Sequence, residues 1–273
     1  MNRMIAKIHE TRGATLLEVL IALAITGIVT ASIMQLYVTQ HTNYLTQDDI
    51  TTIQQNARAS IDELTRNIRM AGRQLPAGLQ ALQASNTNPD TLTVVYKAGN
   101  CDTYLSSPMP LPSAELKCGN DISCFGEGQW VYIYEPDSGI GEWFEITEVQ
   151  AAAFHIQHNT MTLSRCYGAD ALVLAVDQVK FYIDDLTDPE HPCLMVQPIG
   201  MPPQVYAEDI VDLQFQYHLT NGMVVDEPVL VEDIREVIIS VTARSKKPNT
   251  ENKDEPYRTR TFSSSVNLRN IRS

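Results

Sequence analysis

The feature that most constrains this chain is a continuous apolar segment near its start, ATLLEVLIALAITGIVTASIMQLYV, at positions 14–38. As a helix rising 1.5 Å per residue, this segment extends over roughly 37 Å, enough to cross a hydrocarbon layer of about 30 Å. One carboxylate, Glu18, lies inside it. A charge in lipid is costly unless it is paired, so Glu18 needs a partner, unless it simply extends to the lipid headgroups without a specific role.

The residues before the apolar segment are basic. Positions 1–13 carry Arg3, Lys7 and Arg12 against a single acid, Glu10. A basic flank predicts that the N-terminus stays cytoplasmic and that the following chain is exported. An ordinary secretory signal places its small-residue cleavage site after a shorter apolar core, whereas here the small residue, Gly13, comes first. Cleavage at that point would remove the basic leader and keep the anchor.

The sequence GATLLEV, which begins at Gly13, resembles the type IV prepilin cleavage and methylation motif. In that motif a Gly precedes an apolar segment that has Glu at the fifth mature position, and Glu18 is the fifth residue counted from Ala14. The resemblance implies cleavage after Gly13 by a prepilin peptidase, which also methylates the new N-terminus at Ala14. One departure is that Ala14 stands where the family usually has Phe.

The resemblance also gives Glu18 a role. Cleavage creates an α-amino group at Ala14, whose reference pKa is about 8, so a cation joins the carboxylate in the apolar environment. Glu18 is four residues away and can reach the amine of its own helix, or the amine of a neighbouring subunit in a filament. Either pairing neutralises both charges. The second would also set the axial register of an entering subunit, which is the role that the family implies.

The helical pattern continues beyond the membrane-length segment. Apolar residues follow a helical spacing along one stripe, and Gly72 and Pro76 then interrupt the pattern. We therefore expect one helix over roughly 14–71, with a transmembrane or filament-core part at 14–38 and an amphipathic part at 39–72. The stripe, which we expect to pack on the chain's own globular domain, consists of Ile50, Ile53, Ala57, Leu64 and Ile68.

Beyond Gly78 the pattern changes to an alternation typical of strands. It predicts a β-rich domain over 79–273, with a hairpin turn at Asn221-Gly222 and a long cysteine-containing loop at 99–128. The fold class is therefore α+β, with a long N-terminal helix packed on a mostly antiparallel, pilin-like β domain. The predicted strands are 91–98, 129–135, 142–149, 153–158, 172–183, 193–197, 210–219, 235–244 and 258–268.

The order of the later segments resembles the C-terminal half of PilW-type minor pilins. The segments that carry this resemblance are FYIDD, HPCLMVQ, EDIVDLQFQY, IREVIISVTARS and RTFSSSVNLRN, and NARASIDELTRNIRMAGR resembles the end of the family's long helix. The related J-type pseudopilins of type II secretion share this architecture but tend to be shorter.

Five cysteines occur without a CxxC pair, so the spacing disfavours a structural zinc. In an exported domain disulfides become the expectation, and an odd number leaves at least one thiol free or paired between chains. Two disulfides among five cysteines allow 15 arrangements, and we favour only a crosslink within 101–124, because a long loop gains order from one. The candidates are Cys101, Cys118, Cys124, Cys166 and Cys193.

No sequence pattern indicates catalysis or a cofactor, so we expect a protein that is not an enzyme. His155 and His158 would point to opposite faces of a strand, which disfavours a metal pair. The acidic run YIDDLTDPEH lacks the Gly and the terminal Glu of an EF-hand loop, so we expect a solvated hairpin tip, with a calcium site of another type as the alternative. Ser263–Ser265 have no candidate base nearby in sequence. The net charge of −13 disfavours direct nucleic-acid binding.

These expectations lead to a structural function. The resemblance implies a minor pilin that is stored in the inner membrane as a single-pass protein with a periplasmic globular domain. It then enters a type IV pilus on the cell surface, at the tip, and helps to prime assembly. Its partners would be the prepilin peptidase, other minor pilins, the major pilin and the pilus assembly platform. The alternatives are a minor pseudopilin of a type II secretion system and a tip adhesin that binds through loop 99–128.

Overall fold

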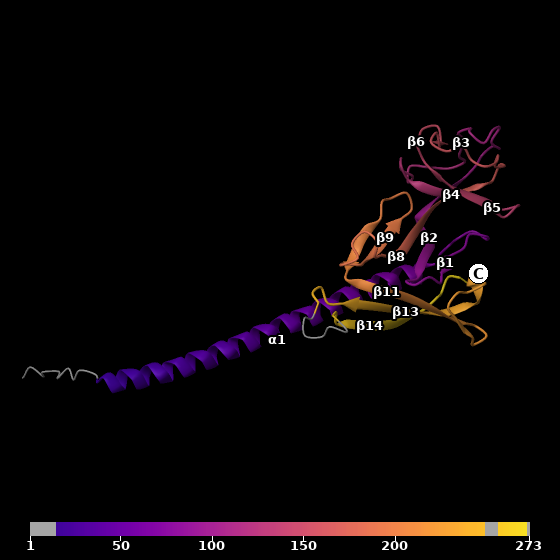
Figure 1. The fold of residues 1–273 in the computed structure, drawn as a ribbon. Helices are drawn as coiled ribbons and strands as arrows, with labels where there is room; N and C mark the ends of the chain where they lie inside the picture. Colours follow the sequence, from indigo (N-terminus) through magenta and orange to yellow (C-terminus); the bar gives the residue numbers. More distant parts are fainter. Residues whose placement is uncertain (1–14, 249–255, 272–273) are drawn as a thin grey trace, which may run out of the picture. The chain divides into compact units, whose positions relative to one another are not determined.

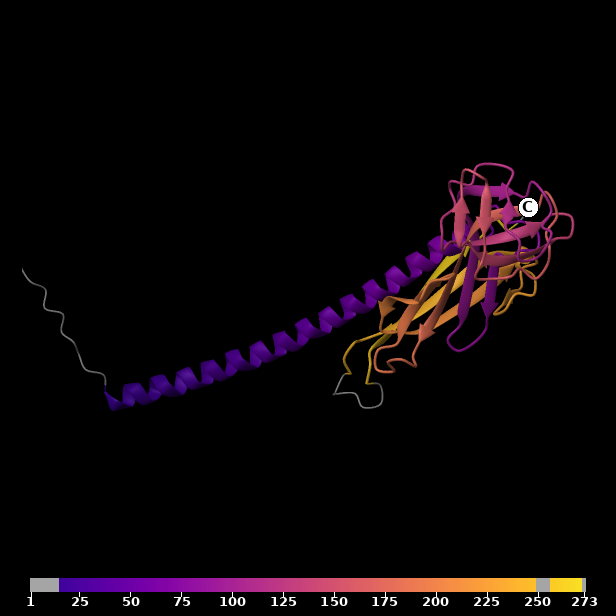
Figure 2. The same cartoon turned by 90° about the horizontal axis from the view of Figure 1, so that it is seen from above.

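The computed structural model describes residues 15–248 and 256–271. The chain forms two units, Met1–Thr51 and Thr52–Ser273, which we describe separately. A single uninterrupted helix, α1 (Leu16–Met70), contains the described residues of the first unit from Leu16 onward and continues into the second (Figures 1 and 2). The prediction of one long helix is therefore confirmed.

In the second unit, α1 buries one stripe of side chains against the β domain. Ile53, Ala57, Leu64 and Ile68 are buried, as their spacing predicted. Ile50 is 36% exposed, so its predicted place in the buried stripe is wrong. Helical spacing gives the direction of a side chain but not the point along the helix at which a packing partner begins.

The strands of the described residues form three sheets. The largest has the order β1-β2-β8-β4-β5, and β9 pairs with β8 and β10 with β9. Their bounds are β1 (Leu82–Ser85), β2 (Thr91–Tyr104), β4 (Trp130–Glu135), β5 (Ile140–Glu145), β8 (Leu172–Asp184), β9 (Cys193–Pro198) and β10 (Gln204–Glu208).

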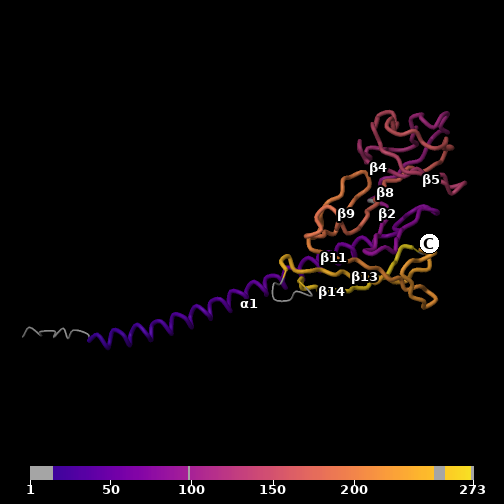
Figure 3. The backbone as a smooth tube through the Cα atoms, in the orientation of Figure 1, coloured from indigo at the N-terminus to yellow at the C-terminus, as the bar shows by residue number. Residues whose placement is uncertain are grey.

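The second sheet has the order β12-β11-β13-β14 and is antiparallel throughout. Figures 1 and 3 show β11, β13 and β14 side by side. The bounds are β11 (Ile210–Leu219), β12 (Val224–Val225), β13 (Ile234–Arg244) and β14 (Thr259–Asn267), and a short helix, η1 (Val231–Asp233), precedes β13. The third sheet is small, with the order β3-β7-β6, and consists of β3 (Leu116–Lys117), β6 (Glu148–Gln150) and β7 (His155–Gln157).

The main hydrophobic core joins α1 to both larger sheets. Leu64 and Ile68 of α1 lie in one cluster with Phe181 of β8 and with Phe215 and Val241 of β11 and β13. Every β pairing between named strands is antiparallel. The α+β prediction, a long helix packed on an antiparallel β domain, is therefore confirmed.

The segment 99–128 is not the irregular loop that the sequence suggested. β2 continues through it to Tyr104 after a register shift between Lys97 and Asp102, and β3 lies further along it. The prediction failed because the Gly, Pro and Ser content of the segment hides its apolar residues. These fill a separate hydrophobic cluster against β4, β5 and β8, and they are Leu105, Met109, Leu116, Cys118, Ile122 and Phe125.

Candidate processing and assembly site

The candidate site is the start of α1, which the side chains of Thr15 and Glu18 organise. The backbone N–H of Thr15 donates to Glu18 Oε2 at 2.9 Å, and the Thr15 hydroxyl donates to the same oxygen at 3.0 Å. In return, the Glu18 N–H lies 3.3 Å from Thr15 Oγ1. This reciprocal pattern is a capping box, which satisfies backbone groups that a helix start leaves without partners.

The capping box gives Glu18 a local role that our sequence analysis missed. The spacing T-x-x-E before an apolar run was the signal that could have revealed it. Both hydrogen bonds from Thr15 end on Oε2, and Oε1 has no hydrogen-bond partner within the described residues. One carboxylate oxygen thus holds the helix start, while the other is available to a further donor. Gly13 and Ala14, the predicted cleavage and methylation positions, lie outside the described residues.

The apolar part of α1 presents its side chains outward. Every residue from 15 to 45 is exposed. By length and composition, α1 is able to cross a membrane. Two hydroxyl groups within this part are satisfied internally, because Thr30 donates to the Thr26 carbonyl at 2.7 Å and Ser32 to the Ile28 carbonyl at 2.9 Å. Such bonds remove the need for water, so this surface suits lipid or the packed helices of a filament.

The five candidate cysteines fall into different environments in the second unit. Cys101 and Cys124 form a disulfide, which crosslinks the segment 99–128. Cys118 is buried, Cys193 is half-buried and Cys166 is exposed, and all three are free thiols. Burial raises the pKa of Cys118 to about 11, so this thiol stays protonated and unreactive at neutral pH.

The two histidines singled out in the sequence have separate partners. His155 in β7 lies 3.2 Å from a carboxylate oxygen of Glu115. His158 follows β7 and is buried, with Nδ1 2.7 Å from the Met161 carbonyl and Nε2 2.9 Å from the Ala114 carbonyl. His158 therefore connects the backbone at Ala114 with the backbone at Met161.

The acidic run between β8 and β9 organises its own backbone. Asp184 Oδ1 accepts hydrogen bonds from the N–H groups of Leu186 and Thr187, each at 3.1 Å, and Asp188 Oδ1 accepts one from Glu190 at 3.1 Å. Hydrogen bonds from Thr187 and Leu186 lower the pKa of Asp184. Among the described residues, no group of three or more His, Cys, Asp or Glu side chains is placed to hold a metal ion.

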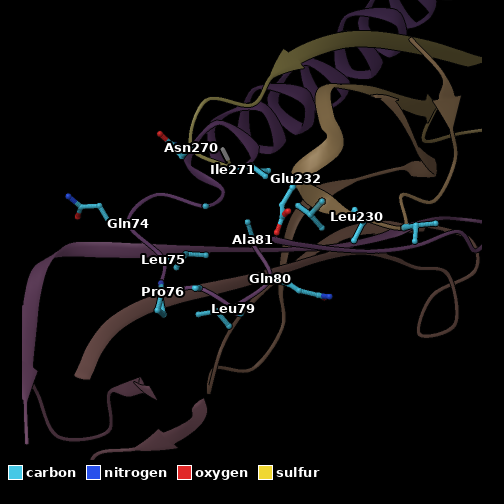
Figure 4. Close-up of a pocket in the computed structure, with 15 residues that line it drawn as sticks. Gln74, Leu75, Pro76, Leu79, Gln80, Ala81, Leu230, Glu232, Asn270 and Ile271 are labelled. Atoms are coloured by element: carbon cyan, nitrogen blue, oxygen red, sulfur yellow. The ribbon is translucent and has the colours of Figure 1, made fainter. Parts of the chain in front are cut away.

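The second unit also contains a pocket of about 440 Å³ (Figure 4). It is lined by the connection between α1 and β1, by residues 229–232 and by Asn270 and Ile271. Leu75, Pro76, Leu79 and Leu230 make much of the lining apolar, and Glu232 is the acidic residue in it. The pocket lining provides hydrophobic contacts, but it does not bring together a group of catalytic side chains.

One comparison with known proteins bears on the N-terminal site. Residues 9–34 match the family model described as the prokaryotic N-terminal methylation motif. No curated protein matches the chain. The matched residues contain Gly13, Ala14, Thr15 and Glu18, together with the first part of α1.

The matched motif implies processing by a prepilin peptidase and a role in pilus or pseudopilus assembly, which is a structural function. The single apolar helix near the N-terminus fits an inner-membrane anchor. The motif and the helix together are the features expected of a type IV pilin or pseudopilin precursor.

Proposed function

We propose that the chain is a minor pilin that is cleaved after Gly13, N-methylated at Ala14 and then incorporated in a type IV pilus at its tip, where it primes assembly. The observation that carries this proposal is the geometry of Glu18 at the start of an exposed apolar helix. Its Oε2 holds the helix start through Thr15, and its Oε1 is available to a donor from outside. The α-amino group of a neighbouring subunit is such a donor, and a filament core supplies the apolar surroundings in which the pairing is strong.

In this proposal, assembly exchanges one apolar environment for another. The outward-facing side chains of α1 are covered by lipid in the stored form and by the helices of other subunits in the filament. Because both environments are apolar, hydrophobicity contributes little to the transfer, and the pairing of Glu18 with an amine decides where the subunit stops. The prepilin peptidase, other minor pilins, the major pilin and the assembly platform are the proposed partners.

The first experiment is intact-mass measurement and N-terminal sequencing of the protein purified from its native membrane. The proposal expects a mature chain that begins with N-methyl-Ala14. A chain that still begins with Met1 would overturn it, since the apolar segment would then be a simple signal anchor. Gly13→Ser should leave the leader attached and block assembly, while a Gly27→Ala control should be processed normally, because a Cβ at Gly27 meets no atom within 4 Å.

The pilus and secretion alternatives require a second measurement, because the N-terminal motif is shared by pilins and pseudopilins. Deletion of the gene should reduce the number of pili per cell and leave the secretion of exported enzymes unchanged. Loss of secretion with normal piliation would instead identify a minor pseudopilin. Shearing pili from the cells and locating the protein with gold-labelled antibody would test the tip position.

A tip adhesin is the second candidate function, and the segment 99–128 favours it. The segment has its own hydrophobic cluster and a disulfide, Cys101–Cys124, so it can present a rigid surface. In this case, replacing exposed residues of the segment, such as Leu111, should abolish adhesion of piliated cells while the pili remain normal in number. Unchanged adhesion would leave the segment with a structural role.

A further inference from the structure

The outer edge of β14 is a long, regular strand edge in the second unit to which no described strand is paired. β14 pairs with β13 over nine residues, from Thr259 to Asn267, without a register shift. No described strand pairs with its other edge, and β14 lies at the margin of the sheet in Figures 1 and 3. A long, regular and unpaired edge is a template for another strand, and proteins normally shorten, bend or cover such edges.

The alternation of hydrogen bonds identifies which backbone groups of β14 are free. The Ser245 N–H donates to the Arg258 carbonyl at 2.8 Å and the Leu268 N–H to the Arg235 carbonyl at 3.2 Å, so the even-numbered positions face β13. In an antiparallel pair the alternate positions then direct their N–H and C=O groups outward. The outward positions are Thr259, Thr261, Ser263, Ser265 and Asn267.

At the opposite margin of the same sheet, the edge of β11 is covered. Asp90 covers the edge of β11 beside β12, because its N–H donates to the Leu213 carbonyl at 2.8 Å and its carboxylate accepts the Phe215 N–H at 2.8 Å. At the margin of the largest sheet, β5 has six residues, and the side chain of its Glu142 accepts a hydrogen bond from the Ser164 N–H at 3.0 Å.

The remaining edge strands are short. β1 has four residues, β10 has five, and β3, β6 and β12 have two or three. A short edge offers few backbone groups to a partner, so β14 is the edge best suited to continue a sheet.

The charge of the β14 region differs from that of the chain. Residues 256–271 contain Arg258, Arg260 and Arg269 but no acidic residue, although the net charge of the chain is −13. Arg260 is exposed. The outward positions themselves carry short polar side chains, and two of them are held by hydroxyl pairs, Ser240 with Ser263 at 2.9 Å and Thr242 with Thr261 at 2.8 Å. The edge thus combines short polar side chains with Arg258 and Arg260 near its start and Arg269 beyond its end.

We propose that the outer edge of β14 binds an extended strand of a different subunit in the same assembly, through backbone hydrogen bonds, with carboxylates of that strand near Arg258 and Arg260. A second copy of β14 is a poor partner, because it would bring further arginines and no carboxylate. The inference rests on the proposed incorporation into a filament. It also gives the minor pilin a specific means of recognising its neighbour beyond the helix-to-helix packing.

Hydrogen–deuterium exchange at single-residue resolution tests the proposal directly. In the membrane-stored protein, the outward amides of Thr261, Ser263 and Ser265 should exchange quickly, while those of Phe262 and Ser264 are protected by β13. In sheared filaments, or in a detergent-extracted complex with other subunits, the outward amides should slow by on the order of 100-fold. Equal exchange of these amides in both forms would overturn the proposal, even if the protein is present in filaments.

Two variants test the same contact without disturbing β13. Ser263→Pro removes an N–H that β13 does not use, so the fold should survive while the partner strand loses a hydrogen bond and meets a ring. Ser263→Ala is the matched control, because it keeps that N–H. Arg260→Glu reverses the charge of an exposed side chain and should repel the carboxylates of the proposed partner strand. Recovery in filaments should fall at least about tenfold for Ser263→Pro and Arg260→Glu and stay normal for Ser263→Ala. Normal recovery of both would contradict the proposal.

Replacing Thr261 with a photoreactive amino acid identifies the strand that binds the outer edge of β14. The expected crosslink joins Thr261 to an extended, acidic segment of another subunit. A crosslink to β14 of a second copy would reject the proposed partner. If the protein never enters filaments but its outward amides are protected in a membrane complex, the strand pairing stands and the filament role fails.

Discussion

The carboxylate of Glu18 accepts a hydrogen bond from the backbone N–H of Thr15, with 2.9 Å between the nitrogen and Oε2. Glu18 therefore has two roles, capping the helix and supplying a negative charge. Suitable substitutions can remove one role and keep the other. Glutamine can fill the capping position of this motif without the charge. Glu18→Gln should therefore keep the helix start and still reduce recovery in filaments about tenfold or more, because a neighbouring amine is left unpaired in apolar surroundings.

Thr15→Ala is the complementary variant, since it removes the hydroxyl partner but keeps the charge of Glu18. It should be incorporated nearly as well as the unchanged protein. Immunoblots of sheared filaments against the membrane fraction measure both effects. Normal incorporation of Glu18→Gln would show that the charge does not set the register.

Asp90 is expected to make the stability of the β domain depend on pH. Asp90 is 2% exposed, its Oδ2 accepts the Phe215 N–H, and its Oδ1 is buried without a partner in the described residues. Burial raises the pKa of Asp90 above its ordinary value. The folded state therefore favours the protonated acid, so its stabilising contribution is complete below about pH 4 and is lost as the pH rises through the raised pKa.

Asp90→Asn should remove that part of the pH dependence and stabilise the domain at pH 7, because the amide oxygen can still accept the Phe215 N–H. Asp90→Ala should destabilise it by about 1–3 kcal/mol, since a buried N–H loses its partner. Denaturant unfolding of the three proteins between pH 4 and pH 8 measures the difference. Parallel pH profiles for Asp90→Asn and the unchanged protein would contradict this account.

The three free cysteines should differ strongly in reactivity. Cys166 is exposed, whereas burial raises the pKa of Cys118 to about 11 and burial with nearby carboxylates raises that of Cys193. Since the thiolate is the reacting form, iodoacetamide at pH 8 should modify Cys166 first and Cys118 roughly 100-fold more slowly. Peptide mass spectrometry over time gives the rates. In denaturant the three should react alike, so a difference that persists there would not come from the fold.

Gly72 ends α1 in a conformation that other residues rarely adopt, with φ of +78°. A Cβ at this position would lie 2.8 Å from the Asn270 carbonyl oxygen and 3.2 Å from Ile271 Cγ1. Gly72→Ala should therefore lower the free energy of unfolding by about 1–3 kcal/mol. Gly126→Ala is the control, because a Cβ there meets nothing within 4 Å. Thermal unfolding measures the stability of both variants. Equal stability of Gly72→Ala and Gly126→Ala would argue against the close approach of residues 270 and 271 to the end of the helix.

Several elements followed from local sequence patterns. The long helix, the turn at Gly72 and strands such as β8, β11 and β13 correspond to strong periodicity and strong helix-ending signals. β1 and β10 were missed, because short edge strands are stabilised by the neighbour with which they pair. The predicted strand 142–149 is interrupted at Ile146 and Thr147, whose backbone groups bond to residues 128–129 and 157. An alternating pattern continues through such a break without revealing it.

The sequence by itself determined the N-terminal features of this protein, because each depends on residues close together in the chain. The basic residues before the apolar segment, Gly13 at its start, Glu18 five residues after Gly13 and the helical stripe all depend on local spacing. The tertiary structure alone decided that Asp90 covers the edge of β11 and that the segment 99–128 has its own core. It also decided that β14 is left with an open edge. These are relationships between residues far apart in sequence, and they depend on which strands become neighbours.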